Sequence, residues 1–366
     1  MAEIDGFLTL MVEKKASDLH FCTGCKPILR IDGDVIPLQE ELVTAQRART
    51  LLYEIMPKRN EDEFNRTHDT DFAYDIQDYG RYRVNIFMDR RGMCGVFRLI
   101  PSELLTMEDL GLPTPVKKFC NLRKGLVLVT GPTGSGKSTT LAAMIDHINE
   151  KRSEHIITIE DPVEFVHESK RCLVNQREIH THTASFSTAL RAALREDPDI
   201  VLVGEMRDLE TTHIAIETAE TGHLVFGTLH TTTAISTIDR LIDQFPSSQQ
   251  QQIRTMLASS LKGVVAQNLI KKREGGRIAA LEILVVNQAV SALIRESKLQ
   301  QIMSVMQTGK KEGMTILNQE LVRLVETKVV TAEDAYWAAP DKEDFIKRVP
   351  DCLGSSGGRF VPPEEY

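Results

Sequence analysis

One glycine-rich stretch has the residue types and the spacing that binding a phosphate chain requires. It reads Gly-Pro-Thr-Gly-Ser-Gly-Lys-Ser-Thr over residues 131–139 and fits the pattern G-x-x-x-x-G-K-[ST]. The apolar, β-branched run at 126–130 predicts a buried strand before it, and apolar residues at helical spacing follow it. A glycine loop between a strand and a helix presents backbone N–H groups and a helix N-terminus to phosphates. The residues that we expect to bind a nucleoside triphosphate are therefore Gly131, Pro132, Thr133, Gly134, Ser135, Gly136, Lys137, Ser138 and Thr139.

Two side chains of this loop have separate expected roles. The Lys137 ammonium should reach the β- and γ-phosphates, and the Ser138 hydroxyl should hold Mg²⁺. ATP and Mg²⁺ are accordingly the ligands that we expect. The alternative is a glycine-rich turn with a chance lysine, which is disfavoured because the strand, the loop and the helix all agree.

Acidic residues stand at the ends of two further predicted strands. The apolar run at 156–159 is followed by Glu160 and Glu164, and the run at 199–204 is followed by Glu205. Carboxylates at the carboxyl ends of strands in an α/β sheet lie where ligands bind. A carboxylate at the position of Glu205 organises Mg²⁺ and its waters, so we expect the metal site to combine it with the loop serine. The alternative for any one of these carboxylates is an exposed charge at a strand end.

Histidines occur at a third strand end and in one loop. The strand predicted within 222–230 has Thr228 and His230 at its far end, on what should be the same edge as the phosphate loop. We expect His230 to sense the γ-phosphate, with Thr228 nearby. His180 and His182 have a spacing that metal ligands use, but a solvated loop is the better interpretation because the pair stands alone.

The chain has one closely spaced cysteine pair, Cys22 and Cys25. A C-x-x-C pair serves as half of a zinc site or as a redox pair, but no second pair completes a tetrahedral site. We therefore expect two reduced thiols in a loop between strands.

The pattern of residues 1–100 predicts a compact α+β domain. Its expected elements are an N-terminal helix, a hairpin turning at Asp32-Gly33, one or two helices at 44–66, and strands at 69–76, 81–88 and 93–100. Three arginines lie on these last strands: Arg81, Arg83 and Arg98. Arg81 and Arg83 share one face of their strand, since they are two residues apart. The pattern favours a solvated charged edge, and the alternative is a basic face that meets a nucleotide held by a neighbouring subunit.

The remainder of the chain predicts a linker, a phosphate-loop domain and a tail. Proline and glycine indicate the linker at 101–115, and the phosphate-loop domain is expected at 116–340. Between residues 248 and 336 the pattern is mostly helical, with one β-like run at 277–286. The glycine-, serine- and proline-rich end predicts a mobile tail at 341–366.

Composition excludes some classes of protein. The 366 residues are 42% hydrophobic, which supports packed cores, and acidic residues outnumber basic ones by 52 to 44. A formal charge of −8 argues against a protein built around nucleic acid. No signal peptide and no apolar run of membrane-spanning length are seen in the sequence. We expect a cytoplasmic protein that touches a membrane only through partners.

Four stretches in this order resemble motifs of the secretion-ATPase superfamily. They correspond to its Walker A motif, Asp box, Walker B motif and His box, at residues 131–139, 159–164, 203–208 and 220–230. Within the superfamily the chain resembles the retraction ATPases of type IV pili. The features that carry this choice are Ser17–His20, the short N-terminal domain and the stretch Ala289–Glu296.

The resemblance implies an α/β fold with a RecA-like P-loop NTPase core and a helical C-terminal part, preceded by a small α+β PAS-like domain. It also implies a homohexamer in which Arg81, Arg83 and Arg98 approach the nucleotide of the next subunit. Such arginines stabilise charge on the transferred phosphoryl group in trans. Glu164 is the expected general base, with Glu160 and Asp161 as second choices.

The expected function is a hexameric motor that uses ATP hydrolysis to retract a type IV pilus through an inner-membrane platform protein. One departure from the family pattern leaves an alternative open. Val290, Ser291 and Ala292 stand where the family has Ile-Arg-Asn. A nucleotide-gated docking or assembly paralogue with little hydrolysis is therefore the competing hypothesis. A nucleic-acid motor is a third hypothesis, which the acidic composition disfavours.

Overall fold

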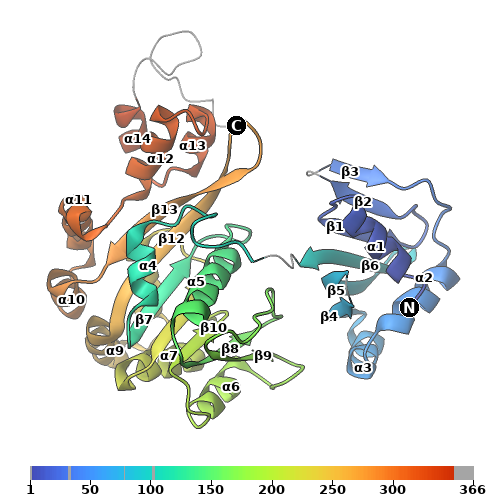
Figure 1. The fold of residues 1–366 in the computed structure, drawn as a ribbon, viewed down its shortest axis with the longest axis horizontal. Helices are drawn as coiled ribbons and strands as arrows, with labels where there is room; N and C mark the ends of the chain where they lie inside the picture. The colour runs from blue at the N-terminus through green and yellow to red at the C-terminus, as the bar shows by residue number, and fades with distance from the viewer. Residues whose placement is uncertain (1, 32–33, 78, 101–103, 350–366) are drawn as a thin grey trace. The chain divides into compact units, whose positions relative to one another are not determined.

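The computed structural model describes residues 2–31, 34–77, 79–100 and 104–349. The chain divides into two compact units, at residues 1–103 and 104–366 (Figure 1). Each unit has its own sheet and its own buried apolar core. Across these described ranges, no helix is both long enough and apolar enough to cross a membrane.

In the described part of the N-terminal unit, six strands form one sheet in the order β3-β2-β1-β6-β5-β4, and every neighbouring pair is antiparallel. Its elements are α1 (Asp5–Glu13), β1 (Asp18–Cys22), β2 (Ile28–Ile31), β3 (Asp34–Pro37), α2 (Ala45–Ile55), α3 (Lys58–Thr67), β4 (Asp69–Ile76), β5 (Gly80–Asp89) and β6 (Gly92–Ile100). Along β5 the buried Tyr82, Val84 and Ile86 alternate with more exposed residues. One face of the sheet therefore packs on the core and the other does not.

The helices and strands expected in this unit are confirmed. The three strands predicted after residue 68 are β4, β5 and β6, and the helical region at 44–66 is the pair α2 and α3. The turn predicted at residues 32 and 33 lies outside the described residues, between the paired strands β2 and β3. These elements were predictable because their alternating or helical patterns are local.

In the described part of the second unit, seven strands form one mixed sheet in the order β13-β12-β7-β11-β10-β8-β9, with only β13 antiparallel to its neighbour. The strands are β7 (Gly125–Thr130), β8 (His155–Glu160), β9 (Leu173–Glu178), β10 (Ile200–Val203), β11 (Leu224–Leu229), β12 (Leu261–Lys271) and β13 (Arg277–Val285). The central strands are buried along their whole length, so their sequences are continuous apolar runs.

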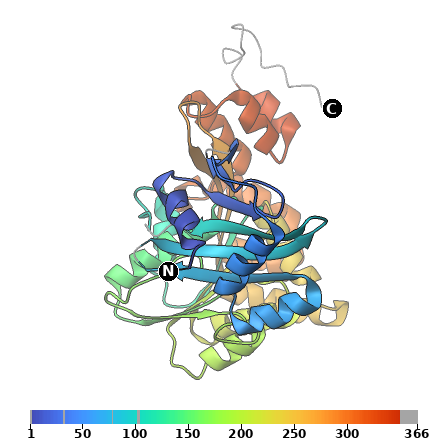
Figure 2. The same cartoon turned by 90° about the vertical axis from the view of Figure 1, so that its right-hand side faces the viewer.

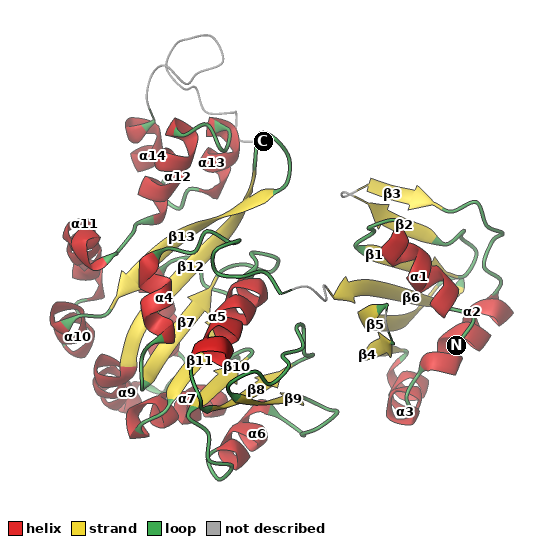
Figure 3. Ribbon diagram, viewed as in Figure 1, coloured by secondary structure: helices red, strands yellow, loops and turns green. Residues whose placement is uncertain are grey.

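Helices cover both faces of this sheet (Figure 3). One face packs against α4 (Thr114–Cys120) and α5 (Lys137–Lys151). Against the other face lie α6 (Phe186–Ala193), α7 (Leu209–Thr221), α8 (Ala234–Asp243) and α9 (Ser247–Ser260). The helix α10 (Gln288–Arg295) packs on α9, and α11 (Ile302–Thr308) packs on α10, with short 3-10 turns at η1 (Leu299–Gln301) and η2 (Gly309–Glu312). The last helices, drawn in red in Figures 1 and 2, build a separate apolar cluster; they are α12 (Leu317–Glu326), α13 (Ala332–Ala338) and α14 (Lys342–Arg348).

A buried carboxylate joins this C-terminal cluster to the main sheet. Glu282 lies on β13 and is 1% exposed. Its Oε1 accepts a hydrogen bond from the backbone N–H of Ala234 at 2.7 Å, and its Oε2 accepts one from Leu317 at 3.2 Å. These residues begin α8 and α12, so one side chain satisfies free N–H groups at two helix N-termini. Burial raises the pKa of Glu282, and the two backbone hydrogen bonds oppose that shift.

The structure corrects three expectations about the second half of the chain. The region expected to be mostly helical contains a long strand, β12, besides the predicted β13. This strand pairs on both sides and is largely buried, so it lacks the alternation that distinguishes a strand from a helix in sequence. Part of the expected linker belongs to the second unit, because Met107 and Leu112 are buried in its core. The first part of the expected mobile tail is helical instead, because α14 packs its fully buried Phe345 into the C-terminal cluster, and residues 350–366 lie outside the described residues.

Candidate active site

The phosphate loop lies between β7, the strand that follows α4, and the helix α5. Gly131 has φ +146°, and a Cβ there would collide with the carbonyl oxygen of Gln267 and the side chain of Ser135. Only glycine permits this close approach of the loop to β12. The requirement for glycine thus comes from the neighbouring strand as well as from the ligand.

Lys137 begins α5 and folds back over the loop. Its Nζ donates to the carbonyl oxygens of Gly131 at 2.9 Å and Pro132 at 3.0 Å. Burial lowers the pKa of Lys137, and the negative charges of Glu205 and Glu164 oppose that shift. The structure therefore brings this lysine into the electrostatic range of both carboxylates, although they follow different strands.

The second acidic strand end is a cluster of opposite charges. Oε1 of Glu205 lies 2.8 Å from Nε2 of His230 and 2.5 Å from Nε of Arg207. Burial raises the pKa of Glu205, but the hydrogen bond and charge of Arg207, together with His230, outweigh it and hold the pKa below its usual value. The parallel strands β10 and β11 end side by side, which places His230 against Glu205. Thr228, at the end of β11, donates its hydroxyl to the carbonyl oxygen of Gly204 at 2.5 Å.

The first acidic strand end has a different electrostatic character. Burial raises the pKa of Glu160 to about 7, although it accepts hydrogen bonds from Thr158 at 2.6 Å and Gln176 at 3.2 Å. Glu164 is half-buried, and its charge adds to the rise in the pKa of Glu160. The two carboxylates thus differ in their surroundings. Glu160 is hydrogen-bonded to side chains of β8 and β9, whereas the charge of Glu164 acts on Lys137.

The three arginines predicted as site residues lie on the N-terminal unit. Arg81 donates to Asp75 at 3.0 Å, and Arg98 donates to the buried Asp18 at 2.8 Å. Arg83 is exposed and stands directly opposite Arg98 on the paired strands β5 and β6. These two arginines therefore share one face of the sheet, and Arg81 and Arg98 already have carboxylate partners.

Sequence reasoning missed two residues of the site. Gln267 on β12 is 2% exposed; its Nε2 donates to the carbonyl oxygen of Ser135 at 2.5 Å, and its Oε1 accepts from the Thr140 hydroxyl at 2.9 Å. It was missed because β12 itself was not predicted. Arg207, which contacts Glu205, stands two residues beyond the acidic strand end, and that position was the only signal for it.

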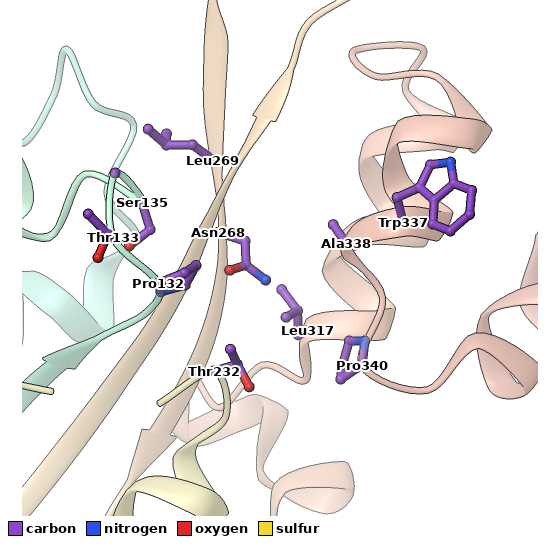
Figure 4. Close-up of a pocket in the computed structure, with 11 residues that line it drawn as sticks. Pro132, Thr133, Ser135, Thr232, Asn268, Leu269, Leu317, Trp337, Ala338 and Pro340 are labelled. Atoms are coloured by element: carbon purple, nitrogen blue, oxygen red, sulfur yellow. The ribbon is translucent and has the colours of Figure 1, made fainter. Parts of the chain in front are cut away.

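A pocket of about 410 Å³ adjoins the outer side of the phosphate loop (Figure 4). Pro132 to Ser135 form one wall, the Asn268 side chain lies between the walls, and Leu317 with Pro340 lies opposite. The lining combines apolar side chains with the Asn268 amide and the hydroxyl residues Thr133, Ser135 and Thr232, a mixture that a small polar ligand can use.

The donor set fits a nucleotide with a divalent cation. The glycine cradle is one that a Cβ would fill, and the Ser135 Oγ is buried without a hydrogen-bond partner among the described residues. Ser138 and Glu205 carry oxygen atoms of the kind that Mg²⁺ prefers. Within the described residues, no group of three His, Cys, Asp or Glu side chains is arranged as a metal site of its own.

A glycine-rich phosphate loop follows the carboxyl end of a central strand, and acidic and histidine side chains lie at the neighbouring strand ends. This arrangement defines a P-loop nucleotide-binding protein. A family model described as "Type II/IV secretion system protein" matches residues 2–336, so the chain belongs to this family.

Similar proteins from pilus systems match nearly the whole chain. The chain is 50% identical to "Type IV pilus retractation ATPase PilT" of Pseudomonas aeruginosa, over 94% of this chain and 100% of that protein. It is 48% identical to a "Twitching motility protein" of Neisseria gonorrhoeae, over 88% of this chain and 86% of that protein. The crystal structure of the pilus retraction motor PilT with bound ADP superposes with a TM-score of 0.88 at 46% identity, covering 94% of this chain and 98% of that one.

Replacing Gln267 with methionine tests the role of β12 in shaping the loop. The substitution keeps the length of the side chain but removes both hydrogen bonds, so we expect nucleotide affinity to fall about tenfold. Titration calorimetry with MgATP measures the change. Thr140→Val, which removes one of the two bonds, should give a smaller loss. Unchanged affinity in Gln267→Met would show that the loop keeps its shape without this contact.

The raised pKa of Glu160 predicts a pH dependence of stability. The folded state binds the proton up to about pH 7 and the unfolded state only to about pH 4.5, so the stabilisation is present below pH 4.5 and is lost as pH rises through 7. Between about pH 5 and pH 8, wild type should lose roughly 1–3 kcal/mol more unfolding free energy than Glu160→Gln. Urea unfolding followed by the fluorescence of Trp337, the one tryptophan, measures this. Parallel profiles for the two proteins would contradict the prediction.

Proposed function

We propose that this chain is an ATP hydrolase that works as a homohexameric motor and retracts a type IV pilus by withdrawing pilin subunits, the basis of twitching motility. The observation that carries the proposal is the convergence of the phosphate loop, both acidic strand ends and His230 at one sheet edge, in a chain that aligns with all of a retraction ATPase. The name of the Neisseria relative supports the same motility role.

We assign a RecA-like core to the second unit and a PAS-like fold to the first. The mixed sheet with the phosphate-loop strand β7 between β11 and β12 supports the first assignment. The small antiparallel sheet with three helices in the described part of the N-terminal unit supports the second. In this scheme the PAS-like domain covers residues 1–100.

The roles proposed for the site residues follow from their surroundings. The loop N–H groups and Lys137 hold the phosphates, so the ammonium exchanges its two carbonyl partners for phosphate oxygens. Ser138 and, through water, Glu205 would hold Mg²⁺, which supplies positive charge at the β- and γ-phosphates. Glu164 orients the attacking water as general base. The negative charge of Glu164 acts on Lys137, which supports this choice. Glu160 is less suitable, because its carboxylate already accepts a hydrogen bond from Thr158.

His230 is proposed to sense the γ-phosphate. Its contact with Glu205 supports the idea, because a cation or phosphate that interacts with the Glu205 carboxylate would change the contact between Glu205 and His230. Thr228 holds the same strand end against β10. The sensor thus needs no large movement to register the ligand.

Arg81, Arg83 and Arg98 are proposed to complete the site of the neighbouring subunit. Their side chains lie on adjacent strands, and Arg83 is exposed. The carboxylates that now pair with Arg81 and Arg98 hold these side chains ordered until the interface closes. Hydrolysis then depends on the position of the neighbour, which is what a ring-shaped motor requires.

We place this motor in the cytoplasm, at the inner membrane through a pilus platform protein, with neither nucleic acid nor direct membrane insertion involved. The formal charge of −8 supports the first exclusion. The stretch Ala289–Glu296 is mostly the helix α10, in which Val290 and Ile294 are fully buried. Val290 keeps an apolar residue where the family has isoleucine, which supports retention of the helix.

The competing function is a docking or assembly paralogue with little hydrolysis. The observation that favours it is the pair Ser291 and Ala292, which replaces a large polar pair on a half-buried part of α10. An assay of ATP turnover separates this function from the motor.

Substituting Glu164 with glutamine should abolish turnover and leave MgATP binding within about twofold, because glutamine keeps the size of the side chain but cannot take a proton from water. Steady-state phosphate release and calorimetry measure the two quantities. The matched control is Glu160→Gln, which should keep measurable turnover. Near wild-type turnover in Glu164→Gln would show that another group is the base.

Specific ATPase activity should rise with protein concentration as the hexamer assembles. Phosphate release is measured alongside mass by light scattering over the same concentrations. A rise that follows the hexamer supports catalysis completed in trans. Activity that is independent of assembly would contradict the cross-subunit role of the arginines. A stable hexamer that binds ATP without hydrolysing it would favour the docking paralogue.

A further inference from the structure

Three thiols gather at one end of the N-terminal sheet, and the nucleotide chemistry uses none of them. Cys22 is the last residue of β1, and Cys94 stands directly opposite it on β6. Cys25 follows Cys22 by three residues. All three are free thiols. This cluster contains the C-x-x-C pair that the sequence singled out.

A tight turn holds Cys25 close to Cys22. The backbone N–H of Cys25 donates to the carbonyl oxygen of Cys22 at 3.1 Å, and Gly24 between them has φ +76°. This is a β-turn with glycine at its third position, so the two Cα atoms lie within about 7 Å. The Thr23 hydroxyl anchors the turn to the carbonyl oxygen of Met93 at 2.8 Å. A disulfide needs Cα atoms about 4.4–6.8 Å apart, which this turn can reach with little movement.

A cation lies against one of the two sulfur atoms. Nη1 of Arg91 donates to Sγ of Cys25 at 3.2 Å. The arginine stem packs on Gly24, where an added Cβ would lie 3.2 Å from Cδ of Arg91. A guanidinium in this position places a positive charge beside the sulfur that attacks an electrophile. Cys25 is also half-buried rather than enclosed, so a small oxidant can reach it.

The other two thiols are poor first nucleophiles. Burial, followed by the hydrogen bond that the Cys22 thiol donates to Cys94, raises the pKa of Cys22 to about 12. Cys94 is 1% exposed, and burial raises its pKa as well. Cys25 has the guanidinium of Arg91 beside its sulfur, so it reacts first, and Cys22 is the neighbouring thiol that resolves the product.

We propose that Cys25 and Cys22 form a thiol redox site, in which a hydroperoxide oxidises Cys25 and Cys22 closes a disulfide across the turn. The Cys25 thiolate attacks the peroxide, its O–O bond breaks, and the products are the Cys25 sulfenic acid and, after protonation, water or an alcohol. Sγ of Cys22 then attacks Sγ of Cys25, the S–O bond breaks, and hydroxide leaves with the Cys22 proton as water. The pair loses two electrons, and the peroxide gains them. This inference is independent of the proposed motor function.

The test treats the full-length protein with hydrogen peroxide, blocks free thiols with N-ethylmaleimide under denaturing conditions, and maps tryptic peptides by mass spectrometry. Cys22 and Cys25 share the peptide 16–30, and Cys94 lies in the separate peptide 92–98. We expect peptide 16–30 to become lighter by two hydrogens and to carry no label, while Cys94 stays fully labelled. A cross-link between the two peptides, or oxidation of Cys25 without any disulfide, would overturn the proposal.

Two variants distinguish a specific redox site from the general oxidation of an accessible thiol. Arg91→Met removes the cation from an exposed position, and we expect oxidation of Cys25 to slow at least about threefold. Cys94→Ser should leave the disulfide yield unchanged, because Cys94 is not its partner. An equal rate of oxidation in Arg91→Met would refute the role of the guanidinium. Loss of the disulfide in Cys94→Ser would show that Cys94 takes part in the bond and that the proposed pairing is wrong.

Discussion

The parallel alignment of β7, β8, β10 and β11 is the constraint on which the candidate active site depends. Each of these strands is buried and runs in the same direction, so their carboxyl ends meet along one edge. The phosphate loop, Glu160, Glu205 and His230 each follow one of these ends. Groups that lie far apart in sequence are thereby brought to one edge of the sheet, where Glu205 and His230 contact each other.

Inside this edge the charged groups are already paired with one another. Lys137 is bonded to loop carbonyls, and Glu205 is held by Arg207 and His230. At Lys137 and Glu205, a nucleotide and its cation would therefore replace internal partners. Such an exchange would lower the net gain from binding, but it would make the arrangement of Glu205, Arg207 and His230 different with and without ligand. The same internal pairing also occurs at Arg81 and Arg98 on the N-terminal unit.

Contacts extend from this edge into the C-terminal helices. The Thr237 hydroxyl on α8 lies 2.7 Å from that of Thr231, next to His230, and 3.4 Å from that of Thr130 before the phosphate loop. The N-terminus of the same helix is held by Glu282, which also holds α12. Polar contacts on α8 thus connect the strand ends, through this helix and Glu282, with the helices that follow β13. Gln267 adds a second connection, from β12 to the loop itself.

Local patterns were enough to predict the phosphate loop, the acidic strand ends, the strands of the N-terminal unit and the helix at Ala289–Glu296. Each of these depends on residue spacing over a few positions, which the physics of strands, helices and turns makes recognisable. The tertiary structure decided what depends on distant partners. It made Leu261–Lys271 a strand, because β7 and β13 flank it, and so placed Gln267 under the loop. It set Arg207 on Glu205 and Cys94 opposite Cys22, and it buried Phe345 in a helix where composition predicted a mobile tail. Pairing across a sheet and burial against a distant helix leave no mark at short spacing, so only the folded chain reveals them.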